Sequence, residues 1–391
     1  MAPDAIGKST ITQVVNTLAR SDGGPARHSL EVNFALNRAG KDVRLVAMKG
    51  ASSDSLLHEM SSREDFPRVA PTELDTRSWA LYKRLLRQIS NSQVLIIHGY
   101  YLWWVPLIAL YAGAQRIPVV VMPHGALTRY DRHKSRTKKF IFNLFGGWLV
   151  NSRAHFVVAS SMEKEELPDS IARQRITVVG AGAEFPRTPS RPKLRFEQPV
   201  QLVTLSRIAK KKRLDLVLEA TRVLMDRGVD ARLTIAGDGS SDYIASLKSL
   251  ADELGLRGRA HFVGPVGGTD KSTLLESSHI FVLPSDDENF GLAFAEAAMY
   301  GIPAVVSDRV GAAGNLPEKA GARITSPNAQ TIADAVMRLV RNYPDAADAM
   351  REYAREEFSW PSVAQRWIDA LPSRRGWTPS HINLTPGAPR D

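Results

Sequence analysis

The sequence predicts an α/β protein with two domains, each a parallel sheet covered by helices. Apolar strand-like runs alternate with amphipathic helical stretches in the first half of the chain, and the same alternation resumes after residue 199. A proline-rich stretch without periodicity separates the two halves. At 391 residues the chain is also too long for one ordinary core. Two Rossmann-like domains are therefore expected, with the cleft between them as the default site.

In the first half, five apolar runs are predicted as strands and four stretches as helices. The predicted strands are Ile11–Val15, Val43–Met48, Val94–His98, Pro118–Met122 and His155–Val158. The predicted helices lie near 25–39, 74–90, 101–115 and 133–152. Because strands and helices alternate, we expect parallel βαβ units with right-handed crossovers.

Residues 184–199 contain four prolines and no periodicity, which is typical of a linker. After them the predicted strands are Val200–Leu205, Arg232–Ile235, His261–Val263, Ile280–Leu283 and Ala304–Ser307. The predicted helices are 214–227, 241–254, 270–277, 291–300 and 328–342, followed by a helical end, 346–371, broken at Trp360-Pro361. The expected domains are 1–185 and 200–357, joined by a linker at 186–199, with a helix at about 358–371 packing back on the first domain.

Composition narrows the classes of protein. The chain has no cysteine, which excludes disulfides and thiolate metal sites and fits a reducing cytoplasm. Its start has no apolar signal-peptide region. The uncharged stretch Tyr100–Ala114 is shorter than the roughly 20 residues that a membrane span needs, so a buried helix is expected there.

The formal net charge of +10 suggests an anionic partner, although a solvated basic surface is the simpler explanation. The basic run 132–139 leads directly into the apolar run 140–145. As a helix, 132–145 would be basic and amphipathic, suited to anionic lipid or to an acidic partner. No nucleic-acid module motif is present, so nucleic acid is not predicted as a partner.

The most informative segment is 285–307, in which Glu288 and Glu296 flank a glycine turn at Gly291. A strand leads in and a helix follows. Strand, glycine turn and helix N-terminus together form a site for a phosphorylated ligand. The carboxylates add acceptors for hydroxyl groups, so the segment indicates a sugar nucleotide.

Cations follow the first strand of the second domain, at residues 206–213. Such a charge run is usually a solvated face. In a loop at the carboxyl end of a strand, however, Arg207 and Lys212 can meet a leaving diphosphate and replace a metal. The acidic run at 286–288 could instead bind Mg²⁺, but a loop at a strand edge splays alternate side chains, and no metal site is predicted.

Two features of the first domain lie in comparable loops. His124, between a predicted strand and Gly125, is expected to project into the cleft, and His98 is a second candidate. Gly23 and Gly24 follow the first strand and precede a helix. They either form a simple tight turn or present backbone N–H groups to a ligand.

These motifs together resemble those of retaining glycosyltransferases of family 4, which have the GT-B fold. Glu288-Asn289-Phe290-Gly291-Leu292 with Glu296 looks like the family signature. Further matches, in order and spacing, are Gly23-Gly24, His124, Ser206-Arg207 with Lys212, Ala236-Gly237-Asp238-Gly239, Phe262-Val263-Gly264, Pro284-Ser285 and Gly301-Ile302-Pro303. The resemblance covers about 10–370, and 122–127 looks like the bacterial branch that builds exopolysaccharide and lipopolysaccharide. One departure is Arg213, where the family often has glycine.

The resemblance implies roles for these residues. Arg207 and Lys212 would neutralise the donor diphosphate, Glu288 would contact hydroxyls of the transferred sugar, and Glu296 would hold the ribose. The backbone of 289–292 would bind phosphate oxygens, and His124 would lie near the reacting centre. The first domain would bind the acceptor. The reaction would retain stereochemistry, with no metal or cofactor required.

The resemblance therefore predicts a hexosyltransferase acting from a nucleotide-sugar donor on a hydroxyl acceptor, such as a lipid-linked saccharide. A cytoplasmic location is expected, and the basic segment 132–145 would hold the protein at the inner face of the cell membrane. Alternatives are a small soluble acceptor, a non-catalytic GT-B partner subunit, or a sugar-nucleotide epimerase or phosphorylase. The donor base, the sugar, the acceptor, the linkage and the oligomeric state are not readable from one sequence.

Overall fold

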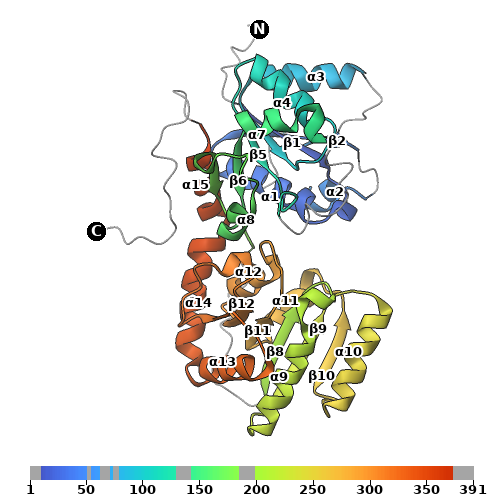
Figure 1. The fold of residues 1–391 in the computed structure, drawn as a ribbon, viewed down its shortest axis with the longest axis vertical. Helices are drawn as coiled ribbons and strands as arrows, with labels where there is room; N and C mark the ends of the chain where they lie inside the picture. The colour runs from blue at the N-terminus through green and yellow to red at the C-terminus, as the bar shows by residue number, and fades with distance from the viewer. Residues whose placement is uncertain are drawn as a thin grey trace, which may run out of the picture. The chain divides into compact units, whose positions relative to one another are not determined.

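The computed structural model describes residues 10–50, 54–61, 71–73, 79–128, 142–184 and 199–372. The chain forms two compact units (Figure 1). Unit 1 comprises residues 1–180 and 363–391, and unit 2 comprises 181–362. Each unit is an α/β structure built on one sheet whose paired strands run parallel, as the alternating pattern predicts.

The sheet of unit 1 has the strand order β3-β2-β1-β4-β5-β6-β7. The five predicted strands are present. They are β1 (Thr10–Thr17), β2 (Asp42–Lys49), β4 (Ser92–His98), β5 (Val119–Met122) and β6 (His155–Val158). The sequence analysis missed the edge strands β3 (Thr72–Glu73) and β7 (Ile176–Val178), because two or three residues give too little periodicity to recognise.

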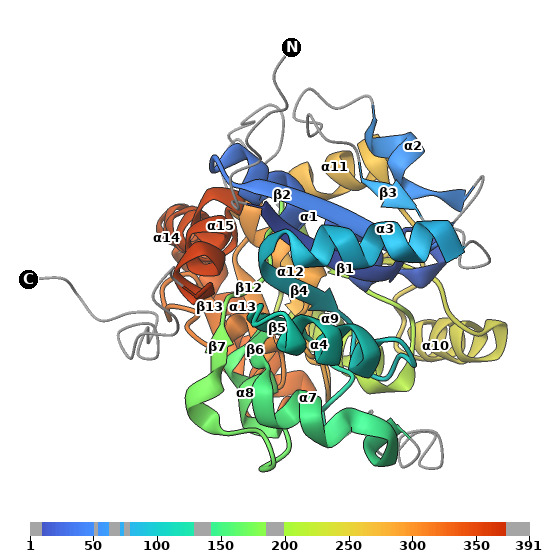
Figure 2. The same cartoon turned by 90° about the horizontal axis from the view of Figure 1, so that it is seen from above.

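Helices cover this sheet (Figure 2). They are α1 (Gly24–Arg38), α2 (Leu56–Met60), α3 (Trp79–Ser90), α4 (Val105–Ala114), a π-helical turn η3 (Asn143–Gly147), α7 (Trp148–Arg153), α8 (Ser161–Glu166) and α15 (Trp360–Ala370), which begins in unit 2 and continues into unit 1. Short 3-10 turns are η1 (Arg20–Asp22) and η4 (Arg173–Arg175). Residues 74–78 and 133–141 of the predicted helices lie outside the described residues.

The sheet of unit 2 has the order β10-β9-β8-β11-β12-β13. Its strands are β8 (Val200–Leu205), β9 (Ala231–Ala236), β10 (Ala260–Gly264), β11 (Ile280–Leu283), β12 (Ala304–Ser307) and β13 (Gly321–Ile324), of which only β13 was not predicted. The helices are α9 (Leu214–Asp226), α10 (Ser241–Glu253), α11 (Gly268–Glu276), α12 (Leu292–Met299), α13 (Ala329–Arg341) and α14 (Tyr343–Phe358). The 3-10 turns are η5 (Lys210–Lys212) and η6 (Gly311–Ala313).

The C-terminal helices meet one residue before the predicted break. Helix α14 ends at Phe358 and α15 begins at Trp360, because Pro361 fits the first turn of a new helix but not the interior of a continuous one. Within unit 1, the Arg366 Nε donates to the Val179 carbonyl at 3.0 Å. Among the described residues, no helix is both long and apolar enough to cross a membrane.

Both sheets reverse their strand order near the centre. In unit 1 the chain moves outward from β1 to one side and from β4 to the other, and in unit 2 it does so from β8 and β11. Open α/β sheets bind ligands in the crevice beyond the carboxyl ends of the strands at such a reversal. Each unit therefore has one preferred place for a site.

Candidate functional site

In unit 2 the loops that follow β8 and β11 are bonded to each other at the strand reversal. The Asp286 N–H donates to the Lys211 carbonyl at 2.8 Å, and the Ser285 hydroxyl donates to the same carbonyl at 3.0 Å. The basic loop and the acidic loop are therefore held side by side by two hydrogen bonds to the Lys211 carbonyl. This contact brings the predicted Lys212 and Glu288 together, 76 residues apart in the chain.

Three consecutive cations pair with three consecutive acids across these loops. Lys211 binds Asp287 at 2.9 Å, and Arg213 lies 3.6 Å from Asp286. Between them, Lys212 forms an ion pair with Glu288. The acids thus point to three different cations rather than to one common centre, the splayed arrangement expected for a strand-edge loop.

The ion pair between Lys212 and Glu288 is the most enclosed of the three. The Lys212 side chain is 9% exposed and that of Glu288 is 22% exposed. Burial lowers the pKa of Lys212 to about 8, with a smaller contribution from the neighbouring Lys211 and an opposing one from Asp287. The charge of Lys212 is therefore sensitive to what occupies the site.

Helix α12 begins at the predicted glycine. Gly291 has φ +93°, and a Cβ there would lie 2.7 Å from the Val310 side chain. A residue with a side chain would therefore be strained and would clash. The Phe290 carbonyl accepts a bond from the Ala312 N–H at 2.7 Å, and the Leu292 side chain is 42% exposed.

Glu296 lies one turn into α12 and is bound by a cation that the sequence analysis did not consider. Lys271, on α11, contacts the Glu296 carboxylate at 2.7 Å. Both predicted carboxylates of the segment, Glu288 and Glu296, are thus neutralised by lysines. Of the predicted cations, Arg207 is exposed and forms no ion pair with another described residue.

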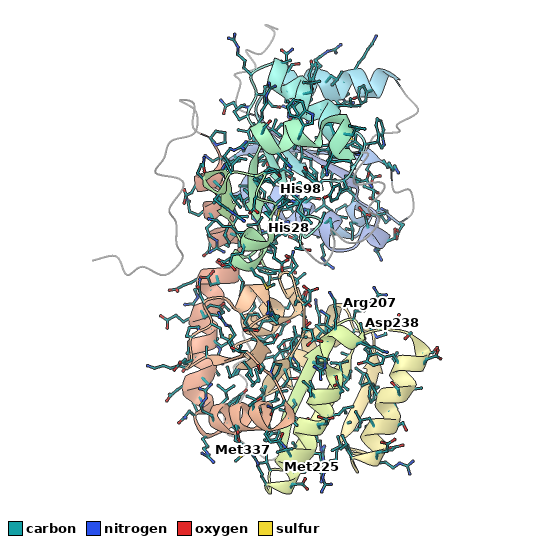
Figure 3. All side chains as sticks on the ribbon, in the orientation of Figure 1. His28, His98, Arg207, Met225, Asp238 and Met337 are labelled. Atoms are coloured by element: carbon teal, nitrogen blue, oxygen red, sulfur yellow. The ribbon has the colours of Figure 1, made fainter. Side chains whose placement is uncertain are left out.

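A pocket of about 730 Å³ opens beside these loops, within the size range of small-ligand sites. It lies at the carboxyl ends of β8, β9 and β10, where Figure 3 shows Arg207 and Asp238 at one end of the sheet of unit 2. Its wall includes Arg207, the 236–240 loop, Pro265 and, from α12, Ala293.

Two glycines let the loop after β9 approach the loop after β8 closely. A Cβ at Gly237 would lie 1.8 Å from the Ser206 carbonyl oxygen, and one at Gly239 would lie 2.2 Å from the Ile208 carbonyl oxygen. No side chain fits at either place. The glycines at 237 and 239 therefore shape the pocket wall.

The departure at Arg213 has a structural explanation. Arg213 has φ +51° and ψ +45°, a left-handed conformation that glycine adopts without strain, which explains why glycine is common at this place in the family. Its guanidinium is held by Asp215 at 3.0 Å and lies close to Asp286. These contacts offset part of the backbone cost.

In unit 1 the predicted glycine turn lies at the start of α1. Gly23 has φ +67°, whereas Gly24 is the first residue of the helix, and a Cβ at either would meet nothing within 4 Å. Gly23 is thus required by the backbone conformation, and nothing nearby requires a glycine at 24. Whether the loop presents N–H groups to a ligand stays a prediction.

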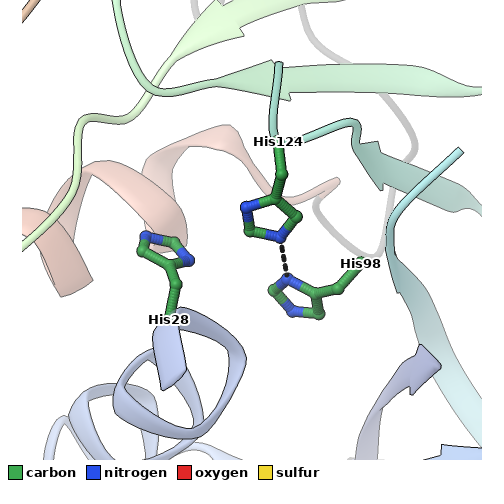
Figure 4. Close-up of side chains that lie close together, drawn as sticks. All are labelled: His28, His98 and His124. Carbon is green, nitrogen blue, oxygen red and sulfur yellow. Dashed lines mark hydrogen bonds between the residues drawn. The ribbon is translucent and has the colours of Figure 1, made fainter. Parts of the chain in front are cut away.

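His124 belongs to a cluster of three histidines at the strand reversal of unit 1 (Figure 4). His98 is the last residue of β4, His124 follows β5, and His28 lies in the second turn of α1. The His98 Nδ1 lies 3.1 Å from the His124 Nε2, and one ring nitrogen from each histidine lies within 4.8 Å of those of the other two. His98 is buried, while His28 and His124 are half-buried.

Burial keeps the three rings neutral at pH 7. Desolvation lowers the pKa of His28 to about 4, and desolvation together with the neighbouring His28 lowers the pKa of His98 to about 3. The pKa of His124 is also lowered, by burial first and then by the other two histidines.

The backbone at His124 is strained and is held in place by a buried acid. His124 has φ +52°, which is uncommon for a residue with a side chain and often marks a functional site. The Glu163 carboxylate accepts the Gly125 N–H at 2.7 Å and the Ala159 N–H at 3.0 Å. Glu163 therefore fixes the turn that carries His124.

Sequence reasoning missed His28, Glu163 and Lys271. His28 and Lys271 lie on helix faces, where a single charged or polar residue reads as part of the surface. The sequence signal for Glu163 is the Ser160-to-Glu163 spacing, which is typical of a helix N-terminus and predicts a cap rather than a contact with residue 125.

Two family models match the chain consecutively. Residues 22–187 match the model described as Glycosyltransferase Family 4, and residues 186–357 match Glycosyl transferases group 1. A D-inositol 3-phosphate glycosyltransferase of Saccharomonospora viridis is 30% identical over 69% of this chain and 64% of its own length, just under two thirds. A glycogen synthase of Mycobacterium tuberculosis is 26% identical over 90% of this chain and 92% of its own length.

Solved structures agree on the fold. Anabaena HepE in complex with UDP superposes with a TM-score of 0.71 at 17% identity, covering 93% of this chain and 99% of that one. HepE was also solved with UDP-glucose, and that structure superposes with a TM-score of 0.67 over 92% of this chain and 99% of its own at 17% identity. At this identity the likeness shows a shared GT-B fold.

Proposed function

Because the chain belongs to the family-4 type of glycosyltransferases with the GT-B fold, we propose that it transfers a sugar from a nucleotide-sugar donor to a hydroxyl acceptor with retention of configuration. The observation that carries this proposal is the paired loops of unit 2. They set buried Lys212 against Glu288, with a pocket of small-ligand size beside them.

Each group in unit 2 suits one part of such a donor. The pocket takes the nucleoside, and Glu296 binds the ribose hydroxyls after exchanging its contact with Lys271. The N–H groups at the start of α12 and the side chains of Arg207 and Lys212 bind the diphosphate. Glu288 then accepts hydrogen bonds from hydroxyls of the transferred sugar.

The chemical step needs electrostatic stabilisation more than a protein base. The acceptor oxygen forms a bond to the anomeric carbon as the bond from that carbon to the diphosphate oxygen breaks. The acceptor proton passes to the departing phosphate on the same face of the sugar. Arg207 and Lys212 stabilise the negative charge that develops there, which is the role a metal plays in other transferases, so we propose that no metal is required. His124 is proposed to lie near the reacting centre.

A donor screen tests this function. UDP-, GDP-, ADP- and dTDP-sugars should be compared by thermal shift, beginning with UDP-glucose because HepE binds it. One donor should stabilise the chain well above the others, release its nucleoside diphosphate when an acceptor is present, and give a product with the anomeric configuration of the donor by NMR. Binding of no donor by a folded sample would refute the proposal. An epimerase would convert its donor without acceptor.

We further propose that the acceptor lies at an anionic membrane surface, as in polysaccharide or glycolipid synthesis. Part of the predicted segment, 132–141, lies outside the described residues, but unit 1 has an apolar face next to it in sequence. This face, the α4/α7 surface, consists of exposed side chains from α4, the turn before it, η3 and α7: Trp103, Leu107, Leu110, Leu144 and Trp148, each 49–66% exposed. The η3 turn packs against α4, since a Cβ at Gly146 in η3 would lie 3.0 Å from the Pro106 side chain in α4.

Charge favours lipid over a second protein as the occupant of this surface. Residues 76–162 contain twelve lysines and arginines and a single acid, Asp131, which is a formal charge of +11 in a chain whose total is +10. Exposed tryptophan and leucine beside such a basic excess suit an anionic bilayer. The alternative, a soluble acceptor, predicts no lipid binding.

Vesicle sedimentation distinguishes an acceptor at an anionic membrane surface from a soluble acceptor. The chain should bind phosphatidylglycerol vesicles, bind phosphatidylcholine vesicles weakly, and lose affinity in the Trp103→Ser and Trp148→Ser variants. Val263→Ser, which changes an exposed apolar residue of unit 2, is the matched control. Equal binding by all variants, or dimerisation through this surface instead, would contradict the proposal.

A further inference from the structure

The three histidines of unit 1 form the one grouping of metal-ligating side chains that converges within the described parts of the chain. They come from three separate elements, α1, β4 and the loop after β5, so their spacing in the sequence does not predict the cluster. Their ring nitrogens approach within 4.8 Å of one another, and the closest pair is 3.1 Å apart. Figure 4 shows the rings gathered around a common region.

We propose that unit 1 binds a transition-metal ion of the Zn²⁺ class through His28, His98 and His124. Zn²⁺ bound by three imidazoles keeps a fourth position open for water or another ligand. At bond lengths of about 2.0–2.1 Å, tetrahedral ligand atoms lie about 3.3 Å apart. The closest nitrogens, 3.1 Å apart, already have nearly this separation, and the third lies within 4.8 Å of them.

The donor set selects the kind of metal. Imidazole nitrogens suit Zn²⁺, Cu²⁺ and Ni²⁺, whereas Mg²⁺ and Ca²⁺ require oxygen ligands, and no carboxylate belongs to the cluster. Neutral imidazole is the form that binds metal.

The surroundings of the cluster suit a site that is preorganised and can be reached. His98 is buried, and its Nε2 makes no hydrogen bond to any described residue, so this ring can turn without breaking a contact at that atom. The Gly125 N–H donates to the Glu163 carboxylate, and this bond fixes the turn that carries His124. His28 and His124 are half-buried, which leaves a way in for the ion.

The proposed site has a consequence that rests on the proposed function. If His124 lies beside the transferred sugar, it cannot serve the sugar and a metal at the same time. A bound Zn²⁺ should therefore inhibit transfer. Metal binding itself is independent of this point and is measured without donor or acceptor.

The test uses the full chain, without a histidine tag and freed of metal by a chelator. Titration with Zn²⁺ in a calorimeter should show one saturable equivalent per chain, and Co²⁺ should give the visible absorption bands of a tetrahedral site. Mg²⁺ should give no heat of binding.

Variants locate the site. His28→Ala is the most informative, because alanine keeps the helix and the residue it replaces is half-buried. Affinity should fall more than about 100-fold, since loss of outer-shell partners alone costs 10–100-fold. His98→Ala and His124→Ala should behave alike.

Two histidines of the same unit serve as controls. His155, on β6, is buried and hydrogen-bonded to Thr177 at 2.8 Å, and His58, on α2, is exposed. Their alanine variants should retain Zn²⁺ binding. Absence of a saturable equivalent in the unaltered chain, or full retention of it in folded His28→Ala, would overturn the inference.

Discussion

The two units place different chemistry at the same position of the same architecture. In unit 2 the strand reversal carries lysine–glutamate ion pairs on bonded loops. In unit 1 it carries three imidazoles that burial keeps neutral. Both lie beyond the carboxyl ends of central parallel strands, where the sheet leaves a crevice.

The difference shows that the sheet fixes where a site lies and the loops fix what it binds. The ion pairs of unit 2 suit a charged diphosphate, because the cations are already in place and exchange one anionic partner for another. The imidazoles of unit 1 suit a neutral hydroxyl or a metal ion. Substitutions confined to one unit test this difference between the two sites.

The largest effect is expected from removing the central ion pair of unit 2. Lys212→Ala and Glu288→Ala should each lower kcat/KM by about 100-fold or more, because each removes an interaction that strengthens in the transition state. Steady-state kinetics with the preferred donor measure it. Glu276→Ala, an exposed acid on α11, should leave the rate unchanged. Unaltered rates in both pair variants would remove these residues from the mechanism.

A second effect concerns the glycine turns of the two units. Gly291→Ala should destabilise unit 2 by about 2–4 kcal/mol, through left-handed strain and the clash with Val310. Gly24→Ala, in the corresponding turn of unit 1, should change stability by less than about 1 kcal/mol, because its backbone and surroundings accept a Cβ. Thermal and urea unfolding measure both. Equal losses would show that the two turns are constrained alike.

A somewhat smaller loss of stability is expected when the turn that carries His124 loses a hydrogen bond to Glu163. Glu163→Gln replaces an oxygen that accepts a backbone N–H with an amide NH₂ that cannot, so it should cost about 1–3 kcal/mol of stability. If His124 acts at the reacting centre, the variant should also lower kcat more than it raises KM. Glu165→Gln, an exposed neighbour, is the control. A variant as stable and active as the original chain would exclude a positioning role for Glu163.

The smallest effect is on pH dependence. The folded pKa of Lys212, about 8, lies below its ordinary value of 10.5, so the ammonium is lost as the pH rises through 8. Donor affinity should then fall by up to tenfold per pH unit, while stability rises with pH between about 8 and 10.5, where this lysine is protonated in the unfolded chain but not in the folded one. Calorimetry from pH 6 to 9.5 would follow it. Lys212→Arg, which stays charged, should bind with a flat profile, and a fall as steep as in the original chain would assign it to another group.

Much of the fold could be predicted from the sequence, because strands and helix boundaries depend on patterns within a few neighbouring residues. The predicted strands are four to eight residues long in the structure and contain short apolar runs, as in β5 and β11, and helix boundaries follow from glycine and proline, as at Gly291 and Pro361. The edge strands β3, β7 and β13 were missed because short segments have little pattern of their own and form by pairing with a neighbour.

The site was readable to the extent that its residues follow strands. Lys212, Glu288 and His124 were found because they lie in loops that follow an apolar run, and such loops lie at the carboxyl edge of a parallel sheet. Lys271 and His28 were missed because a helix can point any of its faces at the site. Only the packing of α11 and α1 on their sheets decides which face does so.

The sequence by itself determined the two α/β domains, the positions of the central strands and the acidic and basic loops of unit 2, because periodicity and turn chemistry act over a few residues. The tertiary structure decided the partners. It joined Lys212 to Glu288, Lys271 to Glu296 and Glu163 to the turn at His124, and it gathered His28 and His98 around that turn. The physical reason is that side chains distant in the chain meet only where strand order and helix packing bring them, and one sequence records the residues but not the order of the sheet.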